Sequence, residues 1–182
     1  MSDCAAQTFA ELRDHLLVHS IKTGDFTLKS GRKSSWFIDS KQTVCRPEAM
    51  LLVADAVLSV LPPEATAIGG LTMGADPVAT AIMHAAASRG TPVNAFVVRK
   101  KEKDHGTQRR IEGPDVAGRR VLAVEDTSTT GTSPLTAVDA LREAGAEVVG
   151  VAVLVNRGAR EKIADRGLAF RAAYELSDLG VG

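Results

Sequence analysis

The sequence predicts an α/β fold in which a central parallel sheet is flanked by helices. Apolar runs recur along the chain, and segments with a helical spacing of apolar residues separate them. Strands that are apolar at nearly every position are typical of a parallel sheet covered on both faces. Their alternation with helices indicates βαβ units. With 182 residues, the chain is long enough for one domain with a substantial core.

The predicted elements follow one another with short connections. Residues 5–20 form an amphipathic helix, 24–42 form two short strands around a Ser-Gly turn, and 47–60 form a helix that starts at Pro47. The remaining elements are a strand at 66–70, a turn at 71–76, a helix at 77–90, a strand at 93–98, a charged loop at 99–113, a strand at 121–124, a helix at 135–146, a strand at 146–156, a short helix, and a last strand within 168–176.

Charge and composition exclude several classes of protein. Lys+Arg and Asp+Glu are both 22, and aromatic residues make up only 4% of the chain. A nucleic-acid binder usually has a basic excess or a stacking platform, so we expect no nucleic-acid partner. No apolar stretch approaches transmembrane length, and the N-terminus has early acids without a signal core. We therefore expect a cytoplasmic protein with no membrane partner.

Cysteine and histidine do not form a clear metal motif. Cys4 and Cys45 lie far apart without metal spacing, which favours a reducing compartment over a disulfide framework. His15 and His19 are four residues apart on the first predicted helix, a spacing that can bind a metal. No third ligand is close in the sequence, so ordinary surface or core histidines are the favoured interpretation.

Polar and glycine-rich clusters follow four of the predicted strands directly. They are residues 69–76, 99–105, 125–133 and 156–157. In an open parallel sheet, ligands bind at the carboxyl ends of the strands. The position of the clusters alone thus predicts a binding site at this edge of the sheet.

Residues 121–133, VLAVEDTSTTGTS, are the most informative stretch. An apolar strand ends in Glu125 and Asp126, a hydroxyl-rich turn follows, and Pro134 begins a helical pattern. Free N–H groups at a helix start favour phosphate, and carboxylates accept hydrogen bonds from ribose hydroxyls or hold Mg²⁺. An ordinary turn with Ser133 as the helix cap would explain Ser133 and Pro134. It would not explain two acids at the end of a buried strand, where desolvation is costly.

The charged loop at 99–113 is a second segment whose composition suits a phosphate-binding site. Cations gather in it with few apolar anchors, and Gly106 is a natural pivot, so we expect the loop to be mobile. Near a phosphate site these cations would neutralise a highly charged leaving group. A solvated charged loop is the alternative on the loop's composition alone. A nucleic-acid patch is disfavoured because no aromatic residues are interleaved.

Several segments resemble type I phosphoribosyltransferases. Residues 121–133 resemble the family's signature for binding 5-phospho-α-D-ribosyl 1-diphosphate (PRPP), and GGLTMGADPVA resembles its pyrophosphate loop. VVRKKEKDHGTQRRIEG resembles the flexible catalytic loop of orotate phosphoribosyltransferases, and FTLKSGRKSSWFIDSK resembles their N-terminal hood. The resemblance covers about residues 10–175. It implies the type I phosphoribosyltransferase fold as one domain over 1–182, with a core at about 46–165 and a hood made of about 20–45 plus the C-terminal segment.

The resemblance also implies an activity and its residues. The activity is transfer of phosphoribosyl from PRPP to orotate, giving orotidine 5′-monophosphate and pyrophosphate, in pyrimidine (UMP) biosynthesis. The implied catalytic residues are Lys100, Lys103, His105 and Asp126. The implied PRPP-binding residues are Lys29, Arg99, Lys100, Lys103, His105, Glu125, Asp126, Thr127, Ser128, Thr129, Thr130, Gly131, Thr132 and Ser133. The implied orotate-binding residues are Phe37, Ile38, Thr129 and Arg157, and a guanidinium fork suits a planar carboxylate.

A metal and a partner are implied in the same way. PRPP itself would hold most of the Mg²⁺, with Glu125 and Asp126 as candidates for contact through water. The resemblance further implies a homodimer whose subunits share the 99–113 loop across the interface.

Two departures and two alternatives accompany the resemblance. Met73 stands where many members have lysine, so either backbone donors suffice there or a cation comes from elsewhere; Trp36 stands where tyrosine is frequent. A transferase for a purine or uracil is one alternative, which the hood opposes. A PRPP-sensing regulator that binds nucleic acid is the other, which the neutral charge and the cationic loop oppose.

Overall fold

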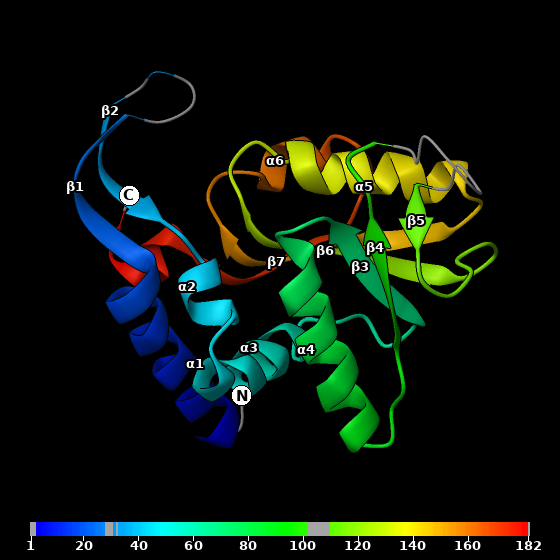
Figure 1. Ribbon diagram of the computed structural model, residues 1–182, viewed down its shortest axis with the longest axis horizontal. Coiled ribbons are helices and arrows are strands. Elements are labelled where there is room, and N and C mark those ends of the chain that lie inside the picture. The colour runs from blue at the N-terminus through cyan, green and yellow to red at the C-terminus, as the bar shows by residue number, and fades with distance from the viewer. Residues whose placement is uncertain (1–2, 28–30, 32, 102–109, 182) are drawn as a thin grey trace.

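A twisted sheet with helices on both faces forms the centre of the molecule (Figure 1). The computed structural model describes residues 3–27, 31, 33–101 and 110–181. In chain order the elements are α1 (Asp3–His15), the π-helical turn η1 (Leu16–Ser20), β1 (Ile21–Thr27), β2 (Lys33–Ile38), α2 (Lys41–Val44), α3 (Pro47–Leu58), β3 (Ala67–Leu71), α4 (Ala75–Ser88), β4 (Asn94–Val98), β5 (Ile111–Glu112), β6 (Arg120–Ser128), α5 (Thr132–Glu143), β7 (Glu147–Asn156), α6 (Arg160–Ala164), β8 (Phe170–Glu175) and the 3₁₀ turn η2 (Leu176–Leu179).

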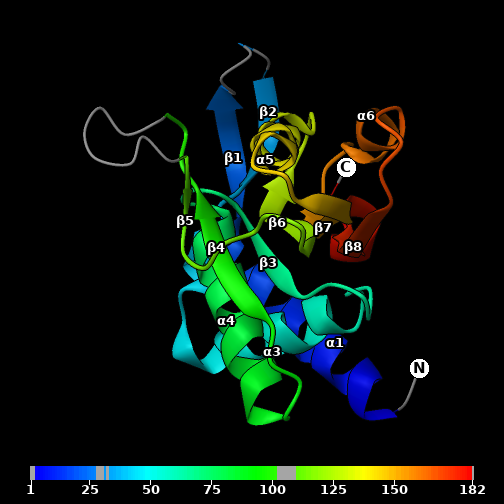
Figure 2. The same ribbon diagram turned by 90° about the vertical axis from the view of Figure 1, so that its right-hand side faces the viewer.

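The sheet has a core on each face, as the apolar strands predict. Helices α1, α3 and α4 cover one face, and α5 and α6 cover the other (Figures 1 and 2). Along β6, Leu122 and Val124 pack into the first core, whereas Val121 and Ala123 pack into the second. Alternate side chains of a strand point to opposite faces, so a strand buried on both sides must be apolar throughout. The predicted parallel sheet flanked by helices is confirmed.

The order of the strands creates an opening at their carboxyl ends. The strand order is β5-β4-β3-β6-β7-β8. Strand β4, which follows β3 in the chain, therefore lies on one side of β3, and β6 lies on its other side. Registered pairing of β3 with β6 ends at Gly69 and Ala123. Beyond that point β3 stays beside β4 to Leu71, while β6 stays beside β7 to Ser128. The diverging ends form the topological switch point, where open α/β sheets bind ligands.

Strands β1 and β2 form a separate antiparallel hairpin at one end of the molecule (Figure 1). The hairpin is tied down at its base, because Ile38 at the end of β2 is buried in the first core. The last strand is anchored nearby, since the Tyr174 hydroxyl donates a hydrogen bond of 2.6 Å to the carbonyl of Phe9 on α1. In the described part of the chain, no helix is long and apolar enough to cross a bilayer.

Three local details differ from the sequence prediction. Helix α5 begins at Thr132 rather than Pro134, and its N-cap is Gly131 with φ +73°, so Ser133 does not cap it. The signature strand continues past Val124 to Ser128, because β7 keeps pairing with it. The predicted charged loop contains β5, which pairs antiparallel with β4. Strand β5 has only two residues, and this is too short for any periodicity to reveal.

Substitution of Gly69 by alanine should destabilise the fold. A Cβ at this position would lie 2.0 Å from the carbonyl oxygen of Phe96 on β4, where backbone cannot yield cheaply. We expect the free energy of unfolding of Gly69→Ala, measured by urea denaturation, to fall by at least about 2 kcal/mol. The control is Ala87→Ser at an exposed position of α4, which should change little. Equal stability of Gly69→Ala and the parent protein would contradict this packing.

Candidate active site

A cavity of about 470 Å³ lies where β3 and β6 diverge. It brings together residues from the turn after β3, the segment after β4, the signature and the end of β7, which are far apart in the sequence. The residues that line it are Lys41, Leu71, Thr72, Met73, Gly74, Lys100, Glu125, Asp126, Thr127, Ser128, Thr129, Thr130, Thr132, Ser133 and Arg157. The polar clusters predicted at the strand ends therefore form one site.

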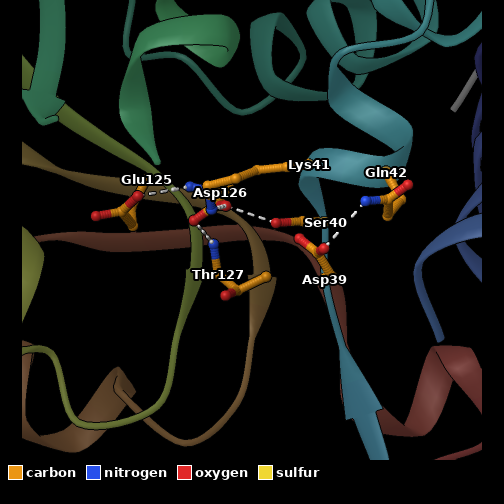
Figure 3. Close-up of polar contacts among 7 residues, drawn as sticks. All are labelled: Asp39, Ser40, Lys41, Gln42, Glu125, Asp126 and Thr127. Carbon is orange, nitrogen blue, oxygen red and sulfur yellow. Dashed lines mark hydrogen bonds and ion pairs between the residues drawn. The ribbon is translucent and has the colours of Figure 1, made fainter. Parts of the chain in front are cut away.

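The two adjacent acids of β6 lie at its centre, and both are buried. Asp126 is held by three donors, as Figure 3 shows. Its Oδ2 accepts hydrogen bonds from Ser40 Oγ at 2.5 Å and Lys41 Nζ at 2.7 Å. Its Oδ1 accepts the Thr127 N–H at 2.7 Å, and Glu125 Oε1 accepts the Asp126 N–H at 3.1 Å. The strand end and α2 together fix the Asp126 carboxylate.

The two carboxyl groups titrate in opposite directions. Burial, reinforced by the neighbouring Asp126 charge, raises the pKa of Glu125 to about 9. Burial also pushes the pKa of Asp126 upward, but the hydrogen bonds from Lys41 and Ser40 outweigh it, and the net pKa is lowered. At neutral pH the pair thus carries one negative charge, which Lys41 balances. Glu125, being protonated, can donate as well as accept a hydrogen bond, which suits a hydroxyl ligand.

The backbone of the turn after β3 lies very close to the carboxyl groups of Glu125 and Asp126. A Cβ on Gly74 would lie 2.0 Å from Glu125 Oε1 and 2.7 Å from Asp126 Oδ1, so a larger residue here would displace the carboxyl groups. Within the turn, Thr72 Oγ1 donates a hydrogen bond of 2.7 Å to Asp76 Oδ2, and the Thr72–Met73 peptide bond is cis. Met73 is exposed and lines the cavity. The turn therefore presents backbone groups and no charged side chain between Leu71 and Gly74.

Gly69 and Gly70 belong to the segment that resembles a pyrophosphate loop, where glycine permits close approach and unusual dihedral angles. The structure shows the close approach but not the unusual dihedral angles. Both lie inside β3 and are buried, and neither has a positive φ. A Cβ on Gly70 would lie 2.1 Å from the carbonyl oxygen of Val124, so its small size serves strand packing.

The hydroxyl-rich segment joins β6 to α5 and shapes an anion site. Ser128 Oγ accepts the Gly131 N–H at 3.2 Å, and the hydroxyls of Thr130 and Thr132 lie 2.8 Å apart. Gly131 has no side chain with which to cap α5. The first amides of a helix without a side-chain cap remain available as donors, and the helix dipole adds positive potential. This end of the cavity suits a phosphate group.

Arg157 lies at the opposite side of the signature from the turn. Its N–H donates to the Ser128 carbonyl at 2.8 Å, which extends the pairing of β6 with β7 by one residue. Its guanidinium carbon lies 5.3 Å from the centroid of the Trp36 ring of the hairpin. Its Nε is buried with no hydrogen-bond partner among the described residues. Burial lowers the pKa of Arg157, and the charge of Asp126 offsets part of that effect. An anionic ligand would satisfy this group.

The other predicted residues are placed as follows. Lys100 is among the residues that line the cavity, whereas Arg99 is not. The Arg99 Nη1 lies 3.6 Å from Glu112 Oε1. Phe37 packs on Phe26 with ring centroids 5.9 Å apart. Neither Phe37 nor Ile38 is among the residues that line the cavity. Three further predicted residues, Lys29, Lys103 and His105, lie outside the described residues.

Ser40 and Lys41 are site residues that the sequence did not reveal. They follow the hairpin in the polar run DSKQ, which looks like any solvated connection. Helix α2, which begins at Lys41, was not predicted either and has only four residues. The contact of Ser40 with Asp126 spans 86 residues, so no local pattern could indicate it.

The acid pair suits a magnesium ion held largely by a substrate. Within the described residues, no group of three or more His, Cys, Asp or Glu side chains could enclose a metal, and His15 and His19 form no such group. Mg²⁺ commonly binds one or two carboxylates together with phosphate oxygens and water. Asp126 supplies an ionised carboxylate on the cavity wall and Glu125 a neutral carboxyl group beside it, and this set fits contact with a hydrated ion through water.

Comparison with known proteins identifies the family. The phosphoribosyl transferase domain matches residues 52–169. An orotate phosphoribosyltransferase of Streptomyces avermitilis is 51% identical over 185 residues, covering 100% of both chains. One from Corynebacterium glutamicum is 52% identical and covers 97% of this chain and 96% of the relative. The crystal structure of Mycobacterium tuberculosis orotate phosphoribosyltransferase with PRPP superposes with a TM-score of 0.81 at 44% identity, covering 96% of this chain and 99% of the other.

Replacement of Glu125 by glutamine should change how stability depends on pH. The unfolded chain releases the Glu125 proton near its ordinary pKa of 4.5, while the folded protein keeps it to about pH 9. The free energy of unfolding of the parent protein therefore falls as pH rises through this window. Glu125→Gln removes that decline. Relative to the parent, we expect a gain of more than about 2 kcal/mol at pH 9 and little gain at pH 4.5. Thermal or urea unfolding at both pH values checks this, and a pH-independent difference would contradict it.

Proposed function

Because this chain belongs to the orotate phosphoribosyltransferases of the type I phosphoribosyltransferase family, we propose that its cavity transfers the phosphoribosyl group of PRPP to orotate. The products are orotidine 5′-monophosphate and pyrophosphate, and the reaction belongs to pyrimidine biosynthesis. One observation carries the proposal: two buried acids and an uncapped helix start share the cavity at the switch point.

The cavity offers separate places for the parts of PRPP. The 5′-phosphate is assigned to the amides and hydroxyls of Thr129, Thr130, Gly131, Thr132 and Ser133, because that end has the positive helix terminus. The ribose hydroxyls are assigned to Glu125 and Asp126. In this arrangement the 5′-phosphate and the sugar lie along the signature.

No covalent nucleophile is required for this reaction. The ribose C1 loses pyrophosphate before or as the base nitrogen attacks, through a transition state like an oxocarbenium ion. Cations that meet the departing charge lower the barrier. Lys100 lines the cavity and is proposed to meet this charge, and Lys103 and His105 are proposed to join it from the 99–113 loop. Asp126, held ionised by Lys41, keeps the ribose oriented near C1.

Magnesium is the proposed cofactor. When bound, it neutralises part of the diphosphate charge and favours departure of pyrophosphate. Glu125 and Asp126 are proposed to contact it through water, with PRPP oxygens as the main ligands. The acid pair supports this role because both carboxyl groups line the cavity next to the proposed place of the ribose.

Orotate is assigned to the side of Arg157. A guanidinium fork binds a planar carboxylate with two parallel hydrogen bonds, and the Nε of Arg157 is already desolvated. Thr129 lines the same cavity. The ring of Trp36 supports the guanidinium from behind. Phe37 and Ile38 remain proposed as hood residues near the base.

The assembly and location are proposals of the same kind. We propose a homodimer in the cytoplasm, with the 99–113 loop shared between subunits. At the described base of that loop, β5 is an edge strand and the Arg99 N–H donates a hydrogen bond of 2.8 Å to the Arg110 carbonyl. The free Cys45 thiol suits a reducing compartment. The proposed division is one domain over 1–182, with a core at about 46–165 and a hood made of about 20–45 plus the C-terminal segment.

Arg157→Lys provides the test of the activity and of base recognition. The parent protein with PRPP, orotate and Mg²⁺ should form orotidine 5′-monophosphate. In Arg157→Lys the KM for orotate should rise about 10- to 100-fold, because one charged bidentate contact is lost, while the KM for PRPP changes little. Steady-state assays measure both constants. Absence of product from the parent protein would overturn the function, and an unchanged orotate KM would remove Arg157 from the base site.

The single tryptophan offers a second test that does not depend on turnover. Trp36 is the only tryptophan in the chain and lies under the Arg157 guanidinium. Binding of orotate to Arg157 should therefore change the tryptophan fluorescence, with a half-saturation equal to the calorimetric Kd. Arg157→Lys should lose most of this change at saturating orotate. Binding seen by calorimetry without any fluorescence change would contradict the contact.

A further inference from the structure

Lys41 occupies a position in the site that anchoring of α2 does not explain. We propose that Lys41 is a diphosphate-binding cation, which neutralises Asp126 in the free protein and donates to the diphosphate of PRPP in the complex. This inference rests on the proposed function and assigns one further residue to that reaction.

The lysine head group lies at the cavity wall. Figure 3 shows Lys41 extending from α2 to the Asp126 carboxylate, and its Nζ is 2.7 Å from Oδ2. The Lys41 side chain is 43% exposed, whereas that of Asp126 is 6% exposed. The ion pair thus has a buried anion and a cation that borders the cavity. A lysine whose task was only to hold α2 would have no need to line the binding cavity.

The ammonium group retains donors for a ligand. An ammonium has three N–H groups, and the structure gives Lys41 one hydrogen-bond acceptor among the described residues, Asp126. A phosphate oxygen entering the cavity can accept another of these bonds without breaking the first. The bond to Asp126 also reduces the rotamer freedom that a flexible lysine loses on binding.

The diphosphate would arrive beside this group. The turn at Gly74 approaches Oδ1 of Asp126, and Lys41 contacts Oδ2, so the two flank one carboxylate. Acids that hold the ribose hydroxyls place C1, and therefore the first phosphate bonded to it, next to the same carboxylate. The turn itself contributes no cation, because Met73 is uncharged. Among the described residues that line the cavity, the other cations are Lys100 and Arg157. Since Arg157 faces Trp36 on the proposed base side, Lys41 and Lys100 are left for the diphosphate.

The affinities for three ligands distinguish diphosphate binding by Lys41 from simple anchoring of α2. Isothermal calorimetry with Mg²⁺ would compare PRPP, pyrophosphate and ribose 5-phosphate on the full chain. For Lys41→Met we expect the Kd of PRPP and of pyrophosphate to rise at least about tenfold, the loss of one charge-assisted hydrogen bond. The Kd of ribose 5-phosphate, which Lys41 can affect only through Asp126, should rise by a clearly smaller factor than the Kd of PRPP. Lys41→Arg should recover most of the affinity for PRPP, because it restores the charge.

Ser40→Ala is the matched comparison. It removes the other side-chain donor to Asp126 Oδ2 but no charge. It should weaken PRPP and ribose 5-phosphate by the same factor, since its effect passes through Asp126 alone. If Lys41→Met does not fold, as judged by thermal unfolding, Lys41→Gln replaces it, because glutamine can still donate to Asp126.

The outcomes decide between the roles. Equal loss of PRPP and ribose 5-phosphate in Lys41→Met would show that the residue acts only through Asp126, which overturns the inference. A lower melting temperature with unchanged affinities would show an anchor only, with the same consequence. If the parent protein binds PRPP and Lys41→Met binds it equally well, this inference alone fails. If the parent protein binds none of the three ligands, the proposed function fails first.

Discussion

The burial of two adjacent carboxyl groups at the end of β6 is the constraint around which the site is built. Two buried charges side by side would be costly, and the protein avoids that cost in two ways. Glu125 remains protonated, while Asp126 is ionised and receives donors from Ser40, Lys41 and its own strand. The acid pair and Lys41 together are therefore nearly neutral before a ligand enters, while Lys100 and Arg157 add positive charge to the cavity wall.

The space for the acids comes from the sheet rather than from a loop. Pairing of β3 with β6 stops at Ala123, two residues before Glu125, and the strands then diverge. The turn that closes the gap must come within contact distance of the carboxylates, which a glycine at position 74 permits. Rigid strands thus position the acids, and the backbone of the turn limits how far they can move. A site on such elements loses little entropy when a substrate binds.

The hairpin of β1 and β2 is joined to this site through two cations. Trp36 on β2 packs on Arg157, and Lys41, three residues after β2 ends, pairs with Asp126. Both contacts run between the hairpin segment and the strand ends of the sheet. The hairpin and the segment that follows it therefore contact cations on both the proposed base side and the proposed diphosphate side of the site.

Local patterns of apolar period, turn residues and adjacent polar groups are enough to predict the parallel sheet, most element boundaries and the Glu125–Asp126 signature. The position of residues 99–105 and 156–157 directly after predicted strands marked both as candidate site segments, and the family resemblance added the roles of their side chains. Tertiary structure alone decided the strand order, and with it the switch point between β3 and β6. It also decided that Ser40 and Lys41 join the site and that Gly131 rather than Ser133 precedes α5. These features depend on pairing and packing between segments as far as 86 residues apart, for which a single chain carries no local periodicity.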